Sequence, residues 1–423
     1  MTLPPQPFLA GPLGAARARL SASVLGFRDF RLLWTGQTIS TVGDQIFPVA
    51  ITIKLLNSGG GASQLGLVLA ARWLALVLFV LVGGVYADRL PRKLVMMGSD
   101  AFRGVTVLGL ALTPGRVPLW LLAGLVFLVG GGEAFFRPAY GAILPSVLPQ
   151  ERLGAGNALT SVSVRSAAVI GPAVGAVVVT TVGPRPAFVV DAATFAISFL
   201  TLLWLREPAF TPGPRQSMVR DVREGLVAVW RRRWVAAVLA LAALQLMFVL
   251  APESVLLPII GRREFHTDAV FGTALAVFSV GGVLGAVTAI RWRPQRPGLV
   301  GMLGILPLTL LPVALATPFS RWWIFGAYFV AGLGLEPFIV FWQVALQREF
   351  PSDLLARVTS VDWLCSFALM PLGLALTGPA VNVVGEADVL WFGAAVAFLP
   401  TLLVLRVPGL PQFRTPGPTG QPR

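Results

Sequence analysis

Long apolar runs recur along this chain, and they constrain its fold more than any other feature. About 20 apolar residues in a helix are enough to cross the hydrocarbon core of a bilayer. Twelve such runs alternate with polar loops, which predicts an all-α polytopic membrane protein. We place the spans at 30–56, 64–87, 94–114, 118–140, 154–181, 186–205, 235–260, 268–290, 298–317, 321–345, 355–381 and 388–406.

The composition also indicates a lipid environment. Only 12% of the 423 residues are charged, about half the share in a typical soluble domain. A net charge of +14 would suggest a nucleic-acid partner if the protein were soluble. Here the basic residues lie in loops between apolar runs, so we expect the lipid bilayer as the partner, and no nucleic acid.

Residues for metal, thiol or phosphate chemistry are scarce. Cys365 is the single cysteine and His266 the single histidine, which excludes an intramolecular disulfide framework and a Cys/His metal cluster. The chain has no Gly-x-x-x-x-Gly-Lys-Ser/Thr loop for ATP. We expect no metal, no cofactor and no enzymatic activity. A membrane enzyme acting on lipid is the less favoured alternative, because it needs a cluster of catalytic residues at the membrane face.

Topology follows from the basic loops. Residues 1–25 are rich in Pro and Gly and lack the apolar core of a cleaved signal peptide. If the N-terminus is cytoplasmic, most of the 33 Lys and Arg residues fall on the cytoplasmic side, as the positive-inside rule requires. We therefore predict a multi-pass protein of the plasma membrane with both termini in the cytoplasm.

A long interruption divides the spans into two sets of six. It contains three prolines and a basic amphipathic stretch at 218–233, which we interpret as a helix at the level of the lipid headgroups. The predicted organisation is a cytoplasmic N-terminal segment (1–29), a six-helix bundle (30–205), a cytoplasmic linker (206–234), a second six-helix bundle (235–406) and a Pro/Gly-rich cytoplasmic tail (407–423).

The two sets show a weak internal repeat at an offset of about 202 residues. Glu133-Ala-Phe matches Glu336-Pro-Phe, and the stretch 83–89 falls on 285–291. Parallel repeats of this kind are typical of transporters whose two halves rock around a central site. We expect two pseudo-symmetric halves and a chain that works as a monomer.

The loop between spans two and three carries a conspicuous charge motif at 84–93. Its acidic residue can face the N-terminus of an odd-numbered helix, where the helix dipole stabilises a carboxylate, and its glycine lets a neighbouring helix come close. Such a latch would close a cytoplasmic gate. Alternatively, the basic residues only enforce topology. The motif residues are Gly84, Asp88, Arg89, Arg92 and Lys93.

This motif resembles the signature loop of the major facilitator superfamily, Gly-x-x-x-Asp-Arg-x-x-Arg-Lys. The passages 27–34, 136–145, 347–351 and 357–360 resemble its drug-exporter branch, which includes macrolide efflux proteins and the enterobactin exporter. The resemblance implies proton-coupled export of a hydrophobic small molecule, such as a drug, antibiotic or secondary metabolite, by alternating access. The alternative is a proton-coupled importer of a small metabolite.

The fifth span contains Gly171-Pro172-Ala-Val-Gly175-Ala176. This resembles the Gly-Pro-x-x-Gly-Gly element of the antiporter branches of the family, although Ala167 and Ala176 stand where the family has glycine. The resemblance implies export. The alternative is a small-residue helix contact with a kink.

Ionisable residues within spans are candidates for function, because each is costly at mid-bilayer unless it is paired or faces a cavity. Asp44 lies about fourteen residues into span one, or roughly 21 Å along the helix. It is our best proton or substrate candidate, with Arg72 as its counter-ion. The alternative is a static Asp44–Arg72 pair. Glu253, in the equivalent span seven, is the second candidate, unless it is simply solvated at the outer surface.

The remaining intramembrane charges suggest networks. Asp100 and Arg103 are three residues apart, so they can pair with each other and with the gate loop. Glu133 and Glu336 are expected to complete charge networks at the cytoplasmic gates of their halves. Arg165 could meet an anionic substrate or pair with Asp362.

Polar and aromatic residues on spans one, four, seven and ten suggest the lining of a substrate cavity. Packing or lipid-facing positions are the alternative for each of them. The candidates are Gln37, Gln45, Phe135, Gln245, Phe248, Phe338, Trp342 and Gln343.

Overall fold

The computed structural model describes residues 23–208, 218–292 and 294–409. Within these ranges the regular elements are all helices, and 12 of them, or runs of them, are long and apolar enough to cross a membrane. The predicted all-α, twelve-span fold is therefore confirmed. Parts of the predicted N-terminal segment (1–22), linker (209–217) and tail (410–423) lie outside the described residues.

The first six spans are mostly single helices, with short 3-10 turns at their ends. They run in the order η1 (Val24–Gly26), α2 (Arg28–Asn57), α3 (Ala62–Arg89), α4 (Arg92–Leu112), α5 (Leu119–Ile143), η2 (Leu144–Ser146), η3 (Gln150–Arg152), α6 (Leu153–Val182) and α7 (Pro184–Trp204).

The chain then continues through a short amphipathic helix into spans that are more often interrupted. The order is α8 (Met218–Trp230), α9 (Arg233–Gln245), the π-turn η4 (Leu246–Leu250), α10 (Ala251–Phe265), α11 (Ala269–Arg291), α12 (Pro297–Ile305), η5 (Leu306–Thr309), α13 (Leu310–Ala316), α14 (Arg321–Glu349), α15 (Ser352–Phe367), α16 (Met370–Val384) and α17 (Glu386–Val404).

Prolines explain where spans seven, nine and eleven are interrupted. Pro252, Pro307 and Pro371 each stand in the first two residues of the segment after the break. Proline lacks the N–H that the α-helical bond needs, and its ring clashes with the carbonyl four residues earlier. The chain therefore shifts to π geometry in span seven, to 3-10 geometry in span nine and to a turn at residues 368–369 in span eleven, and the α-helix then resumes.

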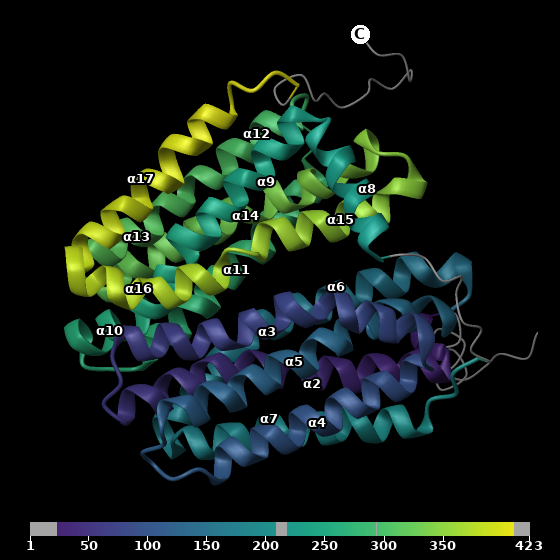
Figure 1. Ribbon diagram of the computed structural model, residues 1–423, viewed down its shortest axis with the longest axis horizontal. Coiled ribbons are helices and arrows are strands. Elements are labelled where there is room, and N and C mark those ends of the chain that lie inside the picture. Colours follow the sequence, from purple (N-terminus) through teal and green to yellow (C-terminus); the bar gives the residue numbers. More distant parts are fainter. Residues whose placement is uncertain (1–22, 209–217, 293, 410–423) are drawn as a thin grey trace, which may run out of the picture.

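The helices form two groups that face each other (Figure 1). Helices α2 to α7 pack together in one group and α9 to α17 in the other, and the groups touch mainly through α3 against α16 and α6 against α11. We call the end where α2 begins and α7 ends the linker end, because α8 lies there, and the opposite end the far end. The two groups lie close at the far end and diverge toward the linker end (Figure 1).

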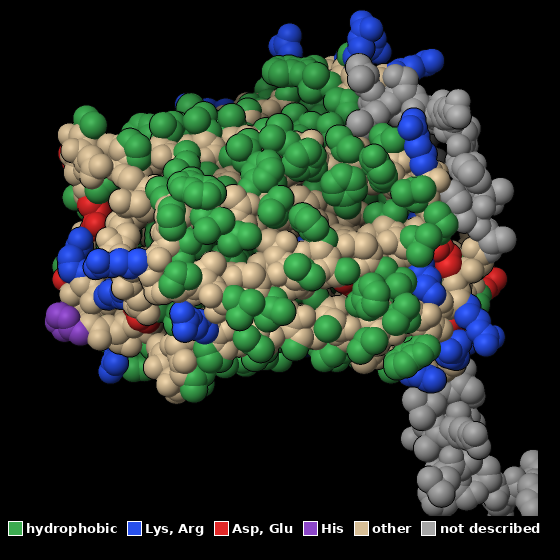
Figure 2. All heavy atoms as spheres, turned by 60° about the horizontal axis from the view of Figure 1, so that its bottom comes forward, with side chains coloured by type: hydrophobic (Ala, Val, Ile, Leu, Met, Phe, Trp, Pro, Cys, Tyr) green, Lys and Arg blue, Asp and Glu red, His purple; other side chains and the backbone are tan. Residues whose placement is uncertain are grey.

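The outer surface is apolar around the middle of the molecule. Large side chains in the middle parts of their helices, such as Leu78, Val105 and Leu399, are more than half exposed, which is costly in water but normal against lipid. Charged side chains gather at the two ends, and few lie across the middle of the face shown in Figure 2. This distribution is expected of a protein that spans a bilayer.

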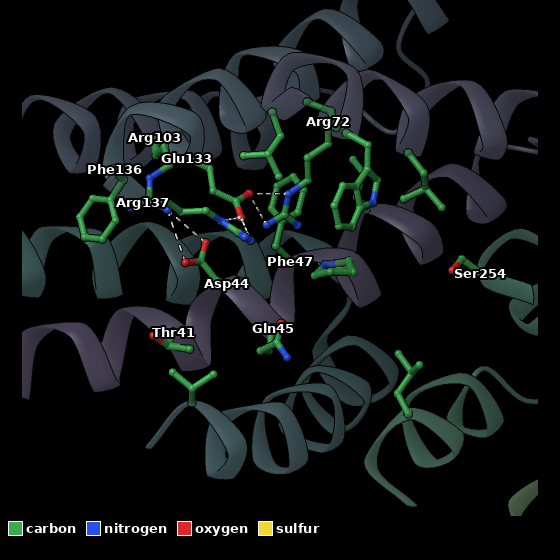
Figure 3. A pocket seen from close by; sticks show the side chains of 18 of the residues that line it. Thr41, Asp44, Gln45, Phe47, Arg72, Arg103, Glu133, Phe136, Arg137 and Ser254 are labelled. Carbon is green, nitrogen blue, oxygen red and sulfur yellow. Dashed lines mark hydrogen bonds and ion pairs between the residues drawn. The ribbon is translucent and has the colours of Figure 1, made fainter. Parts of the chain in front are cut away.

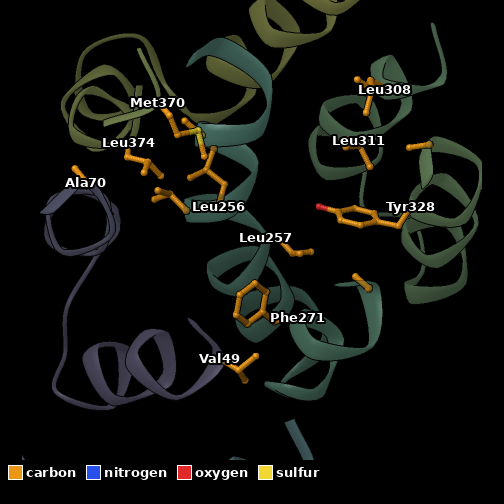
Figure 4. Packing of buried hydrophobic residues seen from close by; sticks show 14 of the residues in the cluster. Val49, Ala70, Leu256, Leu257, Phe271, Leu308, Leu311, Tyr328, Met370 and Leu374 are labelled. Carbon is orange, nitrogen blue, oxygen red and sulfur yellow. The ribbon is translucent and has the colours of Figure 1, made fainter. Parts of the chain in front are cut away.

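At the far end the two groups are joined by tight packing. Figure 4 shows apolar side chains of α2 and α3, such as Val49 and Ala70, facing Phe271 and Leu374 of α11 and α16. The helices come so close that a Cβ on Gly378 would overlap Ser63. These contacts close the far end in this conformation.

Candidate functional site

A cavity of about 620 Å³ lies between the two groups of helices. Its charged lining residues lie on α2 to α5 (Figure 3), and the lining residues of α11 and α16 are apolar. The charged lining residues are Asp44, Arg72, Arg103, Glu133 and Arg137. The opposite lining residues include Phe271, Leu275, Met370 and Leu374, with Ser254 of α10 beside them.

Asp44 belongs to a chain of polar contacts that crosses three helices. Arg103 Nη1 lies 3.4 Å from Asp44 Oδ2, and Arg103 Nη2 donates to Asp100 Oδ1 at 2.8 Å. Ser198 Oγ donates to Asp100 Oδ2 at 2.6 Å, and Gln37 Nε2 donates to Ser198 Oγ at 2.9 Å. The network therefore fixes Arg103 firmly and Asp44 loosely.

Arg103 is buried by its aromatic surroundings. Its guanidinium lies 4.7 Å from the ring centre of Phe136 and 4.3 Å from that of Phe195, a favourable cation–π geometry. Gly132 leaves room for the stem, since a Cβ there would lie 2.5 Å from Arg103 Cγ. Only 2% of the Arg103 side chain is exposed, against 27% of Asp44. Asp44 is thus the cavity-facing end of this network.

Arg72 pairs with Glu133 and not with Asp44, so the predicted Asp44–Arg72 pair is wrong. Glu133 Oε2 accepts from Arg72 Nη2 at 2.9 Å, and its Oε1 accepts from Arg137 Nη2 at 2.5 Å. The reason is close packing of α3 on α5, because Gly130 of α5 lies against the backbone of Arg72. The prediction that Glu133 lies at the cytoplasmic gate is also wrong, since it lines the central cavity.

Glu336 is not at a gate beside Arg291 either. It forms an ion pair of 2.5 Å with Arg165, which joins α14 to α6 across the two groups. Gly282 of α11 lets Glu336 lie close to that helix, its Cγ being 3.0 Å from where a Cβ would stand, and α11 packs against α6. The predicted pair of Arg165 with Asp362 is wrong too, because the Asp362 carboxylate accepts a hydrogen bond from Trp342 Nε1 at 3.1 Å.

Glu253 is buried, so the alternative prediction that it is solvated at the outer surface is wrong. Its residue is 6% exposed, and Tyr328 O–H donates to its Oε1 at 2.5 Å. Glu253 does not line the large cavity, although its neighbour Ser254 does. The tyrosine lies on α14, so this contact ties span seven to span ten.

The gate motif is arranged differently from the prediction. Asp88 is exposed, and the carboxylate at the N-terminus of α4 is that of Glu207, which accepts from the backbone N–H groups of Arg92 (3.0 Å) and Lys93 (3.1 Å). Lys93 Nζ donates to the carbonyls of residues 203 and 205 at 2.9 Å. Gly84 has open space around it, whereas its neighbour Gly83 packs against α5. Asp100 and Arg103 pair with each other, and the further partners are Ser198 for Asp100 and Asp44 for Arg103, not this loop.

We expect Glu207→Ala to lower the free energy of unfolding by about 1 kcal/mol, because α4 loses a carboxylate that accepts two N–H groups at its positive end. The matched change Asp88→Ala should have a smaller effect, since Asp88 is exposed at the C-terminal end of α3. Denaturant unfolding of both variants in detergent measures the difference. A larger loss in Asp88→Ala would assign the gate carboxylate to Asp88.

Two of the eight predicted cavity residues, Gln37 and Gln45, line the large cavity. The other six do not, because helix rotation turns them to neighbours or outward. Phe135 packs on Phe79 and Tyr86, and Phe248 packs on Phe392. Phe338 and Trp342 stack on each other at a small separate pocket. Gln245 donates to Thr401, and Gln343 is exposed.

The antiporter-like element lies at a three-helix contact. Helix α6 continues through Pro172, and Gly171 and Gly175 face α2, where a Cβ on Gly175 would lie 3.3 Å from Ile46 Cα. On the other side, the carbonyl of Pro172 lies 2.8 Å from where a Cβ of Gly272 in α11 would stand. The element therefore lets α6 lie between the two groups.

Three charged residues of the group α2 to α7 were missed from sequence. Arg137 binds Glu133, and Lys54 Nζ donates to the carbonyl of Pro114 at 3.2 Å, just beyond the C-terminus of α4. Asp191 is 1% exposed in the middle of the group α2 to α7. Each is a charge within or beside an apolar run, so the rule that flagged Asp44 would also have flagged Asp191 and Lys54.

Sequence comparison finds similarity over most of the chain. A sequence profile described as Major Facilitator Superfamily matches residues 33–374. The multidrug efflux pump Tap of Mycobacterium tuberculosis is 29% identical over 397 residues, which cover 88% of this chain and 91% of Tap. Macrolide efflux protein A of Streptococcus pyogenes is 27% identical over 379 residues, with 86% and 91% covered. The enterobactin exporter EntS of Citrobacter koseri is 26% identical over 409 residues, with 92% and 94% covered.

Solved structures agree on the fold. A transporter of the POT family in complex with 5-aminolevulinic acid superposes with a TM-score of 0.74 at 15% identity, over 89% of this chain and 95% of the other. The nucleoside transporter NupG gives a TM-score of 0.67 at 14% identity, over 88% and 98%. At these identities the similarity shows the shared arrangement of helices.

Proposed function

The chain belongs to the Major Facilitator Superfamily, and from this we propose that it exports hydrophobic small molecules across the plasma membrane in exchange for protons. Its similarity to proteins named as multidrug, macrolide and enterobactin exporters supports the direction. We assign no enzymatic activity and expect a monomer. The moving bodies are the bundles 30–205 and 235–406, joined by the linker 206–234, which rock around the central cavity.

The cavity suits an amphipathic molecule of drug size. Its volume of about 620 Å³ lies within the range of about 300–1,000 Å³ of small-molecule sites. The wall of Phe271, Leu275, Met370 and Leu374 offers an apolar surface, and the opposite wall offers charges. A substrate with an apolar body and a polar end fits such a pair of walls.

Asp44 is the proposed proton carrier. Glu133 is held by two guanidinium groups at 2.5 and 2.9 Å, whereas Asp44 has Arg103 at 3.4 Å and retains exposure to the cavity. A proton on Asp44 removes its attraction to Arg103, and loss of that proton restores it. This loosely held, cavity-facing carboxylate is the observation that supports proton coupling most strongly.

Orientation is proposed from the distribution of basic residues. Many lie at the linker end, including Arg28, Arg31, Arg89, Arg92, Lys93, Arg231, Arg232 and Arg233, whereas the far end has Lys54, Arg116, Arg185, Arg262, Arg263 and Arg321. The positive-inside rule then places the linker end and both termini in the cytoplasm. On this assignment the conformation is closed toward the outside and ready to receive substrate from the cell.

The test is drug-induced proton movement in proteoliposomes. We expect a panel of hydrophobic drugs to include compounds that move protons with the wild type, and Asp44→Asn to abolish this movement while drug binding persists. The matched control Asp388→Asn changes an exposed aspartate at the start of α17 and should behave as the wild type does.

Other outcomes would change the assignment. Proton movement that is equal in Asp44→Asn and wild type would show that the carrier is another group, with Glu253 the next candidate. Sidedness comes from inverted vesicles, whose interior corresponds to the outside of the cell. Uptake of drug with release of protons there supports export, and uptake only in right-side-out vesicles would make the protein an importer.

A further inference from the structure

Asp191 is a buried carboxyl group that the assignments above do not use. It lies on α7, is 1% exposed, and neither of its carboxyl oxygens has a hydrogen-bond partner or an ion pair. A charged carboxylate left unpaired in a membrane interior costs several kcal/mol or more. Asp191 must therefore be neutral here, with a proton on its carboxyl group.

The local packing makes room for this group beside Asp44. The residue before Asp44 on α2 is Gly43, and a Cβ there would lie 2.6 Å from Asp191 Oδ1. Any larger residue at Gly43 would displace the carboxyl group. Glycine thus lets Asp191 lie against the backbone of α2, next to the proposed proton carrier.

The balance of charges in the cluster around Asp44 also indicates that Asp191 is protonated. Four carboxyl groups, Asp44, Asp100, Glu133 and Asp191, accompany three guanidinium groups, Arg72, Arg103 and Arg137. Glu133 contacts two of the guanidinium groups, and Asp100 shares Arg103 with Asp44. One carboxyl group is in excess, and Asp191 is the one without a partner. One proton on Asp191 makes the cluster neutral.

In the described part of the chain, the remaining cations of α2, α4 and α7 lie near the ends of these helices, for example Lys54 and Arg185, which donate to the carbonyls of Pro114 and Thr113. Near Asp191, α2 contributes Asp44, and α4 contributes Asp100 and Arg103. The only charged residue of α6 is Arg165, which pairs with Glu336 in the other group. Arg103 is engaged by Asp44 and Asp100, and Arg72 is engaged by Glu133.

We propose that Asp191 is a second proton-binding group of the transport cycle, which stores a proton behind Asp44 and passes it to the cavity through Asp44. In this step the O–H bond of Asp191 breaks and an O–H bond forms on Asp44. Arg103, released from the neutral Asp44, then compensates the ionised Asp191. Asp44 gives the proton to water in the cavity, and the reverse sequence reloads the pair from the other side. This inference rests on the proposed proton-coupled function.

Two measurements on Asp191→Asn test the idea. Asparagine has nearly the shape of the neutral acid and cannot titrate, so the variant should fold and bind drug as the wild type does. In infrared spectra we expect the C=O band of a buried protonated carboxyl group in the wild type, with a loss of this band in Asp191→Asn. In proteoliposomes we expect the number of protons moved per drug to fall by about one, because the variant has lost one of the two coupled proton-binding groups. Asp388→Asn should change neither measurement.

The outcomes separate the two proposals. If wild type and Asp191→Asn move the same number of protons per drug, or if their infrared spectra are identical, the role of Asp191 is refuted while export stands. If no drug moves protons with the wild type, the proton-coupled function fails and this inference fails with it. Should Asp191→Asn not fold, Asp191→Leu, which is similar in size and also uncharged, takes its place.

Discussion

Replacement of Arg103 by methionine is expected to lower the free energy of unfolding by about 3–5 kcal/mol, the range for removing one partner of a buried ion pair. The side chain of Asp100 is fully buried and would lose its guanidinium partner at 2.8 Å. Asp44 would lose its ion pair as well. Methionine fills part of the space between Phe136 and Phe195, so the loss of stability comes chiefly from the unpaired carboxylate of Asp100 and not from a cavity.

Denaturant unfolding of the purified protein in detergent measures this loss, with Arg137→Met as the matched control. Arg137 also contacts a carboxylate, but 48% of its side chain is exposed, so its removal should cost about 1 kcal/mol or less. The double variant Arg103→Met/Asp100→Asn should recover part of the loss, since it removes the stranded charge of Asp100. Equal losses in the two single variants, or no recovery in the double variant, would contradict the assigned network.

Gly378→Val is expected to open the far end. A Cβ on Gly378 would overlap Ser63 of α3, so valine pushes α16 away from α3 at the contact that joins the two groups of helices. Overpacking of this kind costs about 1–3 kcal/mol, and every 1.4 kcal/mol changes a population ratio by about tenfold. The conformation with an open far end does not contain this contact, so its population should rise.

Spin labels at exposed far-end positions measure the shift. Cysteines at Gly61 and Val383, with Cys365 replaced by serine, should report a longer distance in Gly378→Val than in the parent. The control is Gly326→Val, because a Cβ at Gly326 meets no atom within 4 Å. Unchanged distances in Gly378→Val would mean that the contact between α3 and α16 does not hold the far end closed.

The position of individual charges was partly predictable from the sequence. Asp44 was singled out because a carboxylate deep in an apolar run needs a cavity or a partner, and it does line the cavity. Its partner was not predictable. Arg72 and Arg103 both lie on helices that follow α2, and only the rotation of those helices turns Arg103 toward Asp44 and Arg72 toward Glu133.

The aromatic candidates failed for a related reason. An aromatic residue in a membrane helix is favourable toward lipid, toward another helix and toward a cavity, so its type does not select a direction. Phe135 and Phe248 lie on the expected spans, yet they pack against neighbouring rings. The carboxylate of Glu207 was missed because it lies beyond the sixth span and reaches α4 only in the folded bundle.

The sequence by itself determined the twelve spans and their approximate ends, because transfer of a long apolar run into lipid is favourable whatever its neighbours are. The superfamily was indicated by the resemblance of the motif at 84–93 to the family's signature loop. Proline alone did not determine where a span is interrupted, since α2 and α6 continue through Pro48 and Pro172, whereas spans seven, nine and eleven break just before a proline. The pairing of charges, the walls of the cavity and the burial of Asp191 were decided only by the tertiary structure. They depend on how closely and at what rotation the helices pack, and glycines such as Gly43 and Gly130 set this by contacts with residues far away in the chain.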